Sequence, residues 1–273
     1  MSHAKTWRVG VAGLGTVGAG LLTFLADSPA FAPAGGRAVV TGVSARSRSR
    51  PRPFDISSLP WFDDPVALAT SAETDIFVEL IGGSDSPAKA AVEAALKAGK
   101  PVVTANKALI AEHGAELAAL AEARGVPLLF EAAVMGGVPA VKIVRESLVG
   151  DEIRSIAGIL NGTCNYILTE MEATGRAFAE VLAEAQRLGY AEADPTMDVG
   201  GFDAAHKITI LAALAFGCAP NYAAAEIEGI ESVELLDIQL ARDLGYRIKL
   251  VASADRSAEG VLVRVHPTLA PLA

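Results

Sequence analysis

The sequence predicts an α/β protein of two domains, a doubly wound parallel sheet followed by an α+β domain. Short apolar strands alternate with helices over residues 1–139, as they do in parallel sheets with helical connections. A glycine-rich turn joins the first strand to the first helix. From residue 140 the alternation gives way to consecutive helices and then to consecutive apolar strands. We therefore expect a dinucleotide-binding type of domain at 1–139 and a second domain with its own sheet at 140–273.

The helices and strands are predicted from the spacing of apolar residues and from the Gly, Pro and polar residues that interrupt them. In the first domain, short apolar runs predict strands at 9–12, 38–44, 75–81, 101–104 and 127–131, and alanine-rich runs predict helices at 17–25, 65–70, 87–98 and 108–124. In the second domain we expect helices at 140–148, 166–174, 178–188, 203–216 and 233–244, with strands at 153–160, 227–230, 248–254 and 260–266.

The composition and net charge limit the kinds of partner that this protein can bind. The 273 residues are 51% hydrophobic and carry a net charge of −9, enough for two cores and unfavourable for nucleic acid or an anionic membrane surface. No apolar stretch reaches the roughly 20 residues of a membrane helix and no signal peptide is recognisable, so we expect a cytoplasmic protein that binds small molecules. Cys164, Cys218 and the four histidines lack metal-ligand spacing, and we interpret them as structural.

The first motif that carries chemistry is the glycine-rich turn. Gly13, Gly15 and Gly18, with Thr16 and Val17 between them, separate an apolar strand from a helix. In a Rossmann-type sheet such glycines allow a tight turn and a close approach of backbone N–H groups to a pyrophosphate. A merely glycine-rich turn is the alternative, and the strand–turn–helix context favours dinucleotide binding.

The end of the second strand favours NADP over NAD. A carboxylate there would bind the ribose 2′-hydroxyl of NAD, but no acid occurs between Asp27 and Asp55. Arg46 and Arg48 follow the strand instead, in a local cluster of arginines that suits a 2′-phosphate. A solvated basic loop is the alternative.

Two later loops follow strand ends, at the sheet edge where doubly wound folds bind ligands. The first contains Gly82, Gly83 and Ser84, and the second contains Lys107 after Ala-Asn. We predict that the first lies near the cofactor and that Lys107 lies near the nicotinamide or the substrate. An ordinary exposed lysine is the alternative, and the position of Lys107 at this edge favours a role in the site.

Residues 189–207 contain four carboxylates and one lysine. Glu192, Asp194 and Asp198 precede a helix in which Asp203 and Lys207 are i and i+4, on one helical face. Such a cage suits a small substrate that carries an ammonium group, with the lysine handling a proton. The alternative is a solvated acidic loop and a surface ion pair. His206 is expected to point away from this face.

These motifs together resemble the homoserine dehydrogenase family. The resemblance is carried by Gly-Leu-Gly-Thr-Val-Gly at 13–18, Ala-Asn-Lys at 105–107, Glu-Ala-Ala-Val-Met-Gly-Gly-Val-Pro at 131–139, Asn-Gly-Thr-Cys-Asn-Tyr-Ile-Leu at 161–168 and Gly-Tyr-Ala-Glu-Ala-Asp-Pro at 189–195. It implies an NAD(P)-dependent enzyme that interconverts L-aspartate 4-semialdehyde and L-homoserine, a step toward threonine, methionine and isoleucine.

The resemblance also implies roles for individual residues. Lys207 would be the acid/base, Asp203 its partner, Glu192 and Asp198 substrate ligands, and Lys107 a second lysine at the site. A monovalent cation, sodium or potassium, would be bound mostly by backbone oxygens at the matching positions Glu131, Val134, Gly136 and Val138. A homodimer or larger homo-oligomer, formed through the sheet of the second domain, is expected.

Two other functions fit the same sequence. One is a catalytically weak paralogue that binds a dinucleotide and dimerises, and the other is a different amino-acid or aldehyde dehydrogenase on this fold. The family usually continues past the last strand into a segment that returns to the dinucleotide domain, and many members add a regulatory domain. We therefore expect this shortened chain to leave apolar surface of its first domain uncovered, with lower stability and weaker cofactor binding.

Overall fold

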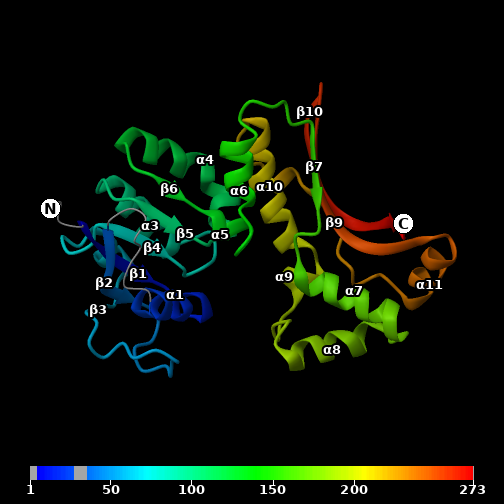
Figure 1. Cartoon of the computed structure of the whole chain (residues 1–273), viewed down its shortest axis with the longest axis horizontal. Coiled ribbons are helices and arrows are strands. Elements are labelled where there is room, and N and C mark those ends of the chain that lie inside the picture. Colours follow the sequence, from blue (N-terminus) through cyan, green and yellow to red (C-terminus); the bar gives the residue numbers. More distant parts are fainter. Residues whose placement is uncertain (1–4, 28–35, 273) are drawn as a thin grey trace. The chain divides into compact units, whose positions relative to one another are not determined.

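The computed structural model describes residues 5–27 and 36–272, which form two compact units, Met1–Val138 and Pro139–Ala273 (Figure 1). The boundary between the units lies one residue before the expected one. His3 lies outside the described residues. Each unit has its own sheet.

Unit 1 contains a six-stranded, wholly parallel sheet in the order β3-β2-β1-β4-β5-β6. The strands are β1 (Lys5–Ala12), β2 (Gly36–Ser44), β3 (Trp61–Phe62), β4 (Ile76–Glu79), β5 (Val102–Thr104) and β6 (Leu128–Leu129). The sheet grows outward in both directions from β1 and β4, which makes their boundary the topological switch point. Doubly wound sheets bind their ligands at the carboxyl edge beside such a point.

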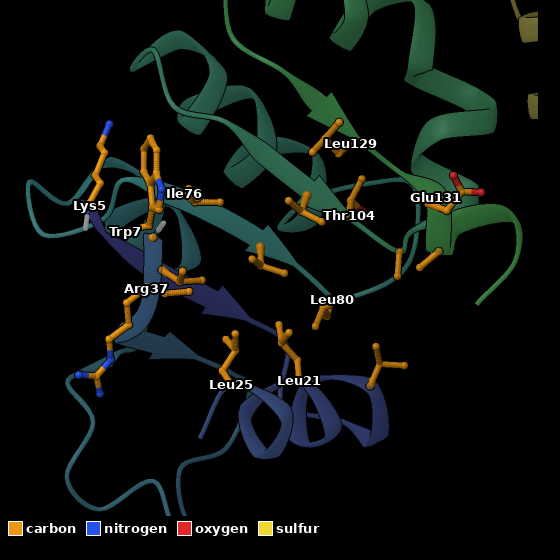
Figure 2. Close-up of a pocket in the computed structure, with 18 residues that line it drawn as sticks. Lys5, Trp7, Leu21, Leu25, Arg37, Ile76, Leu80, Thr104, Leu129 and Glu131 are labelled. Atoms are coloured by element: carbon orange, nitrogen blue, oxygen red, sulfur yellow. The ribbon is translucent and has the colours of Figure 1, made fainter. Parts of the chain in front are cut away.

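The helices of unit 1 are α1 (Thr16–Asp27), α2 (Pro65–Thr70), α3 (Ala88–Lys97), α4 (Lys107–Arg124) and α5 (Glu131–Val134). Helix α3 packs between α2 and α4. Beside α1, one face of the sheet stays open as a groove of about 830 Å³. Figure 2 shows side chains of α1, such as Leu21 and Leu25, and strand residues such as Ile76 and Leu129 around this groove. Apolar side chains of the sheet and of α1 therefore line this groove.

Unit 2 contains a four-stranded mixed sheet in the order β7-β9-β10-β8. Its elements are α6 (Ala140–Lys142), the π-helix η2 (Ile143–Ser147), β7 (Ser155–Gly158), α7 (Gly162–Thr174), α8 (Phe178–Leu188), α9 (Thr196–Val199), α10 (Phe202–Phe216), the 3-10 helix η3 (Tyr222–Ala224), β8 (Glu226–Ile227), α11 (Leu235–Asp243), β9 (Tyr246–Ser257) and β10 (Gly260–Pro271). Helix α10 packs on the β9–β10 hairpin and is buried along most of its length. This rigid, buried helix carries Asp203 and Lys207.

Several expected boundaries were wrong for local reasons. The expected loop at 161–163 is absent, because the Asn161 side chain accepts a hydrogen bond from the backbone N–H of Cys164 and α7 begins at Gly162. The expected strand 127–131 ends at Leu129, and Glu131 opens α5. The expected helix 140–148 changes to π geometry at Ile143.

The two cysteines differ in burial. Cys164 is buried, as expected for a packing residue, but Cys218 is exposed, so its packing role was wrong. Among the described residues, no helix combines the length and the apolar character that a transmembrane segment requires.

An ion pair fastens the start of β4 to β1. The Arg8 side chain donates to both oxygens of Asp75, at 2.7 and 3.1 Å, and the Arg8 backbone N–H donates to Oδ2 at 2.9 Å. These bonds lower the pKa of Asp75 from 3.8 to about 2. A carboxylate with a lowered pKa stabilises the fold above its unfolded pKa, and this contribution is lost as the pH falls through the folded pKa.

We predict that Asp75→Asn lowers the melting temperature at pH 6 and that the difference from the unmodified protein narrows as the pH falls from about 4 to about 2. Thermal unfolding across this pH range measures it. Asp85→Asn, at an exposed loop position, is the control. A difference that stays constant with pH would show that the Asp75 charge contributes nothing.

Candidate functional site

The glycine turn after β1 has the geometry that a pyrophosphate requires. Gly13 has a φ of +102°, and a Cβ there would lie 2.2 Å from the carbonyl oxygen of Leu80. A Cβ on Gly18 would lie 2.0 Å from the carbonyl oxygen of Gly13, whereas one on Gly15 would meet nothing within 4 Å. The turn is therefore closed on the protein side and open at Gly15, at the N-terminus of α1, where Thr16 and Val17 are exposed. These residues fit a dinucleotide phosphate.

The arginine loop lies next to this turn. The Gly13 N–H donates to the carbonyl oxygen of Ser44, the last residue of β2, at 2.8 Å. Arg46 and Arg48 follow and are exposed. Arg52 folds back to donate to backbone carbonyls of the same loop, so its guanidinium organises the loop rather than facing a ligand. Arg46 and Arg48 thus lie in the loop that follows the strand end bonded to the glycine turn, and the Arg48 guanidinium lies 5.9 Å from the centre of the Trp61 ring.

The two later loops of unit 1 also lie where they were expected, after β4 and after β5. Gly82 and Gly83 have φ values of +85° and +80° and are exposed, with Ser84 behind them. Lys107 is half-buried as the first residue of α4, and the side chain of Asn106 caps that helix by accepting from the N–H of Leu109. Both loops thus belong to the carboxyl edge of the sheet.

The lysine of unit 2 is fixed by an anion and by a carbonyl. Lys207 Nζ donates to Asp203 Oδ2 at 2.6 Å and to the carbonyl oxygen of Leu160 at 2.9 Å. The Asp203 side chain is 4% exposed and that of Lys207 19%. The predicted i,i+4 pair is confirmed, and it is a partly buried pair rather than a surface one. Its geometry leaves the ammonium one further donor for a ligand.

Asn161 joins two of the carboxylates and was not predicted as a site residue. Its amide Nδ2 donates to Asp198 Oδ1 at 2.8 Å and to Asp203 Oδ2 at 2.9 Å, while its Oδ1 caps α7. One buried side chain therefore fixes both anions. The signal was available, because Asn followed by a helical run is a typical N-cap.

The nearby thiol has no part in this chemistry. Cys164 Sγ contacts the carbonyl oxygen of Asp198 at 3.1 Å. Burial, together with the charges of Asp198 and Asp203, raises the pKa of Cys164 to about 12. The thiol stays protonated at neutral pH and is not a nucleophile.

The other two acids of the segment lie apart from this network. Asp194 is exposed and accepts hydrogen bonds from the hydroxyl and N–H of Thr196, which lower its pKa. Glu192 is exposed, and its backbone carbonyl accepts from Gln186 at 3.0 Å. His206 stacks on Tyr222 at 4.1 Å between ring centroids, in agreement with a structural role. Asp203 thus contacts the lysine directly, Asp198 is linked to Asp203 through the Asn161 amide, and the described hydrogen bond of Glu192 lies outside this network.

The segment expected to bind a cation is short and continuous. Glu131 and Val134 lie in α5, and Gly136 and Val138 follow in an exposed turn. The carbonyl oxygen of Glu131 accepts from the N–H of Met135 at 3.1 Å. Within the described residues, no group of three or more His, Cys, Asp or Glu side chains has metal-binding geometry. Any cation here would depend on backbone oxygens.

A doubly wound parallel sheet with an open glycine turn after its first strand defines the class of Rossmann-type dinucleotide-binding proteins. In this chain the same polypeptide also carries a second unit, which holds a lysine on a buried carboxylate.

Comparisons with known proteins identify the family within this class. Residues 13–131 match the model of the homoserine dehydrogenase NAD-binding domain, and residues 139–273 match the homoserine dehydrogenase model. A homoserine dehydrogenase of Neisseria gonorrhoeae is 47% identical over 269 residues, which cover 98% of this chain and 61% of that protein. The crystal structure of a homoserine dehydrogenase from Thiobacillus denitrificans has a TM-score of 0.90 and 47% identity, over 98% of this chain and 62% of that one.

A more distant relative is described with a cofactor. It is a hyperthermophilic archaeal homoserine dehydrogenase in complex with NADPH, with a TM-score of 0.80 and 28% identity, over 97% of this chain and 82% of that one. This chain belongs to the homoserine dehydrogenase family. It spans about 61% of the length of the curated relatives that it matches.

We predict that Gly13→Ala abolishes dinucleotide binding, because a Cβ cannot fit 2.2 Å from the Leu80 carbonyl oxygen at a φ of +102°. Gly20→Ala in α1 is the matched control. Its Cβ would meet nothing within 4 Å, so this variant should bind normally. Fluorescence titration with NADPH measures both. Normal binding by Gly13→Ala would refute the assignment of the turn.

We also predict that Asn161→Ala lowers the free energy of unfolding by roughly 2–4 kcal/mol, because it removes a helix cap and two charged hydrogen bonds. Asp64→Ala at the cap of α2 is the control for capping alone, with an expected loss of about 1 kcal/mol. Urea unfolding measures both. Equal losses would mean that the bonds to Asp198 and Asp203 contribute nothing.

Proposed function

We propose that this protein catalyses the NAD(P)-dependent interconversion of L-homoserine and L-aspartate 4-semialdehyde. The observation that carries the proposal is the Lys207 ammonium held on the buried Asp203 carboxylate, with the Asn161 amide donating to the same carboxylate oxygen. Family membership supports the same activity. The glycine turn of unit 1 supplies the dinucleotide cradle.

The chemistry needs a proton donor whose position is fixed. A bound nicotinamide supplies the hydride to the aldehyde carbon or takes it from the alcohol carbon. In the reducing direction, the Lys207 ammonium stabilises the oxygen that becomes negative and then gives it a proton. In the oxidising direction, the neutral amine accepts the hydroxyl proton. Asp203 keeps the lysine in place through both directions.

The substrate also carries an ammonium group that needs an anion. Asp198 is half-buried and Glu192 is exposed in the segment before α10. Both can accept charge-assisted hydrogen bonds from an amino acid, which would orient its reactive carbon. Since Asn161 already fixes Asp198, we propose that Asp198 is preformed for substrate and that Glu192 engages only when substrate is present.

We propose NADP as the preferred cofactor, on the support of Arg46 and Arg48 beside the glycine turn and of the absence of an acid after β2. Two further parts of the proposal rest on family resemblance. One is a monovalent cation on the backbone of Glu131, Val134, Gly136 and Val138. The other is a homo-oligomer.

The first prediction tests the lysine. Lys207→Ala should lower the turnover of homoserine by roughly 10²–10⁴, because the proton then has no positioned donor or acceptor. NADPH affinity should stay nearly unchanged. Lys142→Ala, an exposed lysine of the same unit, is the matched control and should retain full turnover. Turnover by Lys207→Ala within threefold of the unmodified protein would refute the assignment.

The second prediction tests the cofactor preference. NADPH should bind more tightly than NADH, and Arg46→Ala combined with Arg48→Ala should remove most of the difference and of its salt dependence. Arg124→Ala, at the C-terminal end of α4, is the control and should change neither. Dissociation constants for the three proteins and both cofactors measure this. Equal affinities in the unmodified protein would refute the preference.

A further inference from the structure

Glu79 is a fully buried carboxylate at the carboxyl edge of the unit 1 sheet. It is the last residue of β4 and is 0% exposed. Its Oε1 accepts from the backbone N–H groups of Ile81 at 2.7 Å and Gly82 at 3.2 Å, and its Oε2 accepts from the Thr104 hydroxyl at 2.5 Å. The Asn106 amide lies at 3.4 Å from Oε1. These four donors are all neutral.

The described partners of the Glu79 carboxylate are therefore neutral hydrogen-bond donors. Burial of a carboxylate is strongly unfavourable unless its oxygens are satisfied, and an ionised carboxylate is a pure acceptor for several donors. The donors come from the loop after β4, from the last residue of β5 and from the segment after β5. Glutamine would keep the shape but present an amide N–H₂ toward the Thr104 hydroxyl, so it would not reproduce this arrangement.

The bonds of Glu79 connect two loops that are distant in sequence. Asn106 donates to the carbonyl oxygen of Gly83 at 2.7 Å, and its N–H donates to Thr104 Oγ1 at 2.9 Å. Asn106 also caps α4, whose first residue is Lys107. The Glu79 carboxylate thus lies at the centre of a closed network that sets the turn at Gly82 and Gly83 relative to the start of α4.

We propose that Glu79, acting through Thr104 and Asn106, is a positioning residue for the dinucleotide. It holds the Gly82–Gly83 turn and the α4 N-terminus in their binding arrangement before the cofactor arrives, so that binding does not have to order them. The inference rests on the dinucleotide binding of the proposed function, but not on the identity of the substrate. Glu79 itself is buried and does not touch the cofactor.

Thr104 offers the sharpest test, because its size can be kept while its hydroxyl is removed. Thr104→Val and Glu79→Gln should each raise the dissociation constant for NADPH about tenfold. Thr104→Ser keeps the hydroxyl, so its dissociation constant should stay within twofold of that of the unmodified protein. Thr74→Val, a buried threonine just before β4 at the opposite edge of the sheet, is the matched control and should leave the constant unchanged. Fluorescence titration and melting temperature without ligand are measured on all five proteins.

The outcomes separate positioning from stability. A raised dissociation constant in Thr104→Val with a melting temperature equal to that of Thr74→Val supports the proposal, even if Glu79→Gln fails to fold. Affinities of Thr104→Val and any folded Glu79→Gln within twofold of the unmodified protein would overturn it, as would an unmodified protein that does not bind NADPH. Homoserine turnover, followed separately, tests the proposed function: NADPH binding without turnover would remove that function and leave the role of Glu79 intact.

Discussion

One oxygen atom, Oδ2 of Asp203, is the point on which the candidate site of unit 2 depends. It accepts from the Lys207 ammonium at 2.6 Å and from the Asn161 amide at 2.9 Å. A buried carboxylate with one donor removed keeps its desolvation cost, so neither partner can be lost cheaply. The requirement brings together α7, through its cap, and α10, through its first turn. The position of Lys207 therefore follows from the need of the buried Asp203 carboxylate for hydrogen-bond donors.

Unit 1 also contains a buried carboxylate, that of Glu79, but its described hydrogen-bond donors are all neutral. The Glu79 carboxylate is buried at a strand end and is satisfied by donors from segments up to 27 residues away. In both units a buried carboxylate fixes the position of loops that a hydrophobic core alone would leave adjustable.

The glycines of unit 1 have different structural roles. Gly13 is required by a close backbone approach, whereas Gly82 and Gly83 supply positive φ in open space.

The sequence predicted the parallel sheet, the second sheet and the Asp203–Lys207 pair, because each rests on local period or on residues close in the chain. The Asp203–Lys207 pair is an i,i+4 contact, which helix geometry alone determines. Asn161 is recognisable as a helix cap, but its bonds to two distant carboxylates could not be found in this way, and neither could the partners of Glu79. Their partners lie between 2 and 42 residues away, and a buried polar residue in an apolar run gives no sign of which distant donors satisfy it. Glu192 stays a predicted substrate ligand, because among the described residues its exposed side chain has no protein partner in the network of Asn161 and Lys207 that would fix its position.

The central claim is that the Asp203 charge positions Lys207 for proton transfer, and Asp203→Asn tests it most directly because the substitution keeps the shape of the side chain. The measurement is homoserine turnover, with NADPH affinity and melting temperature followed on the same samples and Asp194→Asn as the control for an exposed carboxylate of the same segment. We expect Asp203→Asn to remain folded and to bind NADPH while turnover falls by roughly 10²-fold. Turnover within threefold of the unmodified protein would contradict the account.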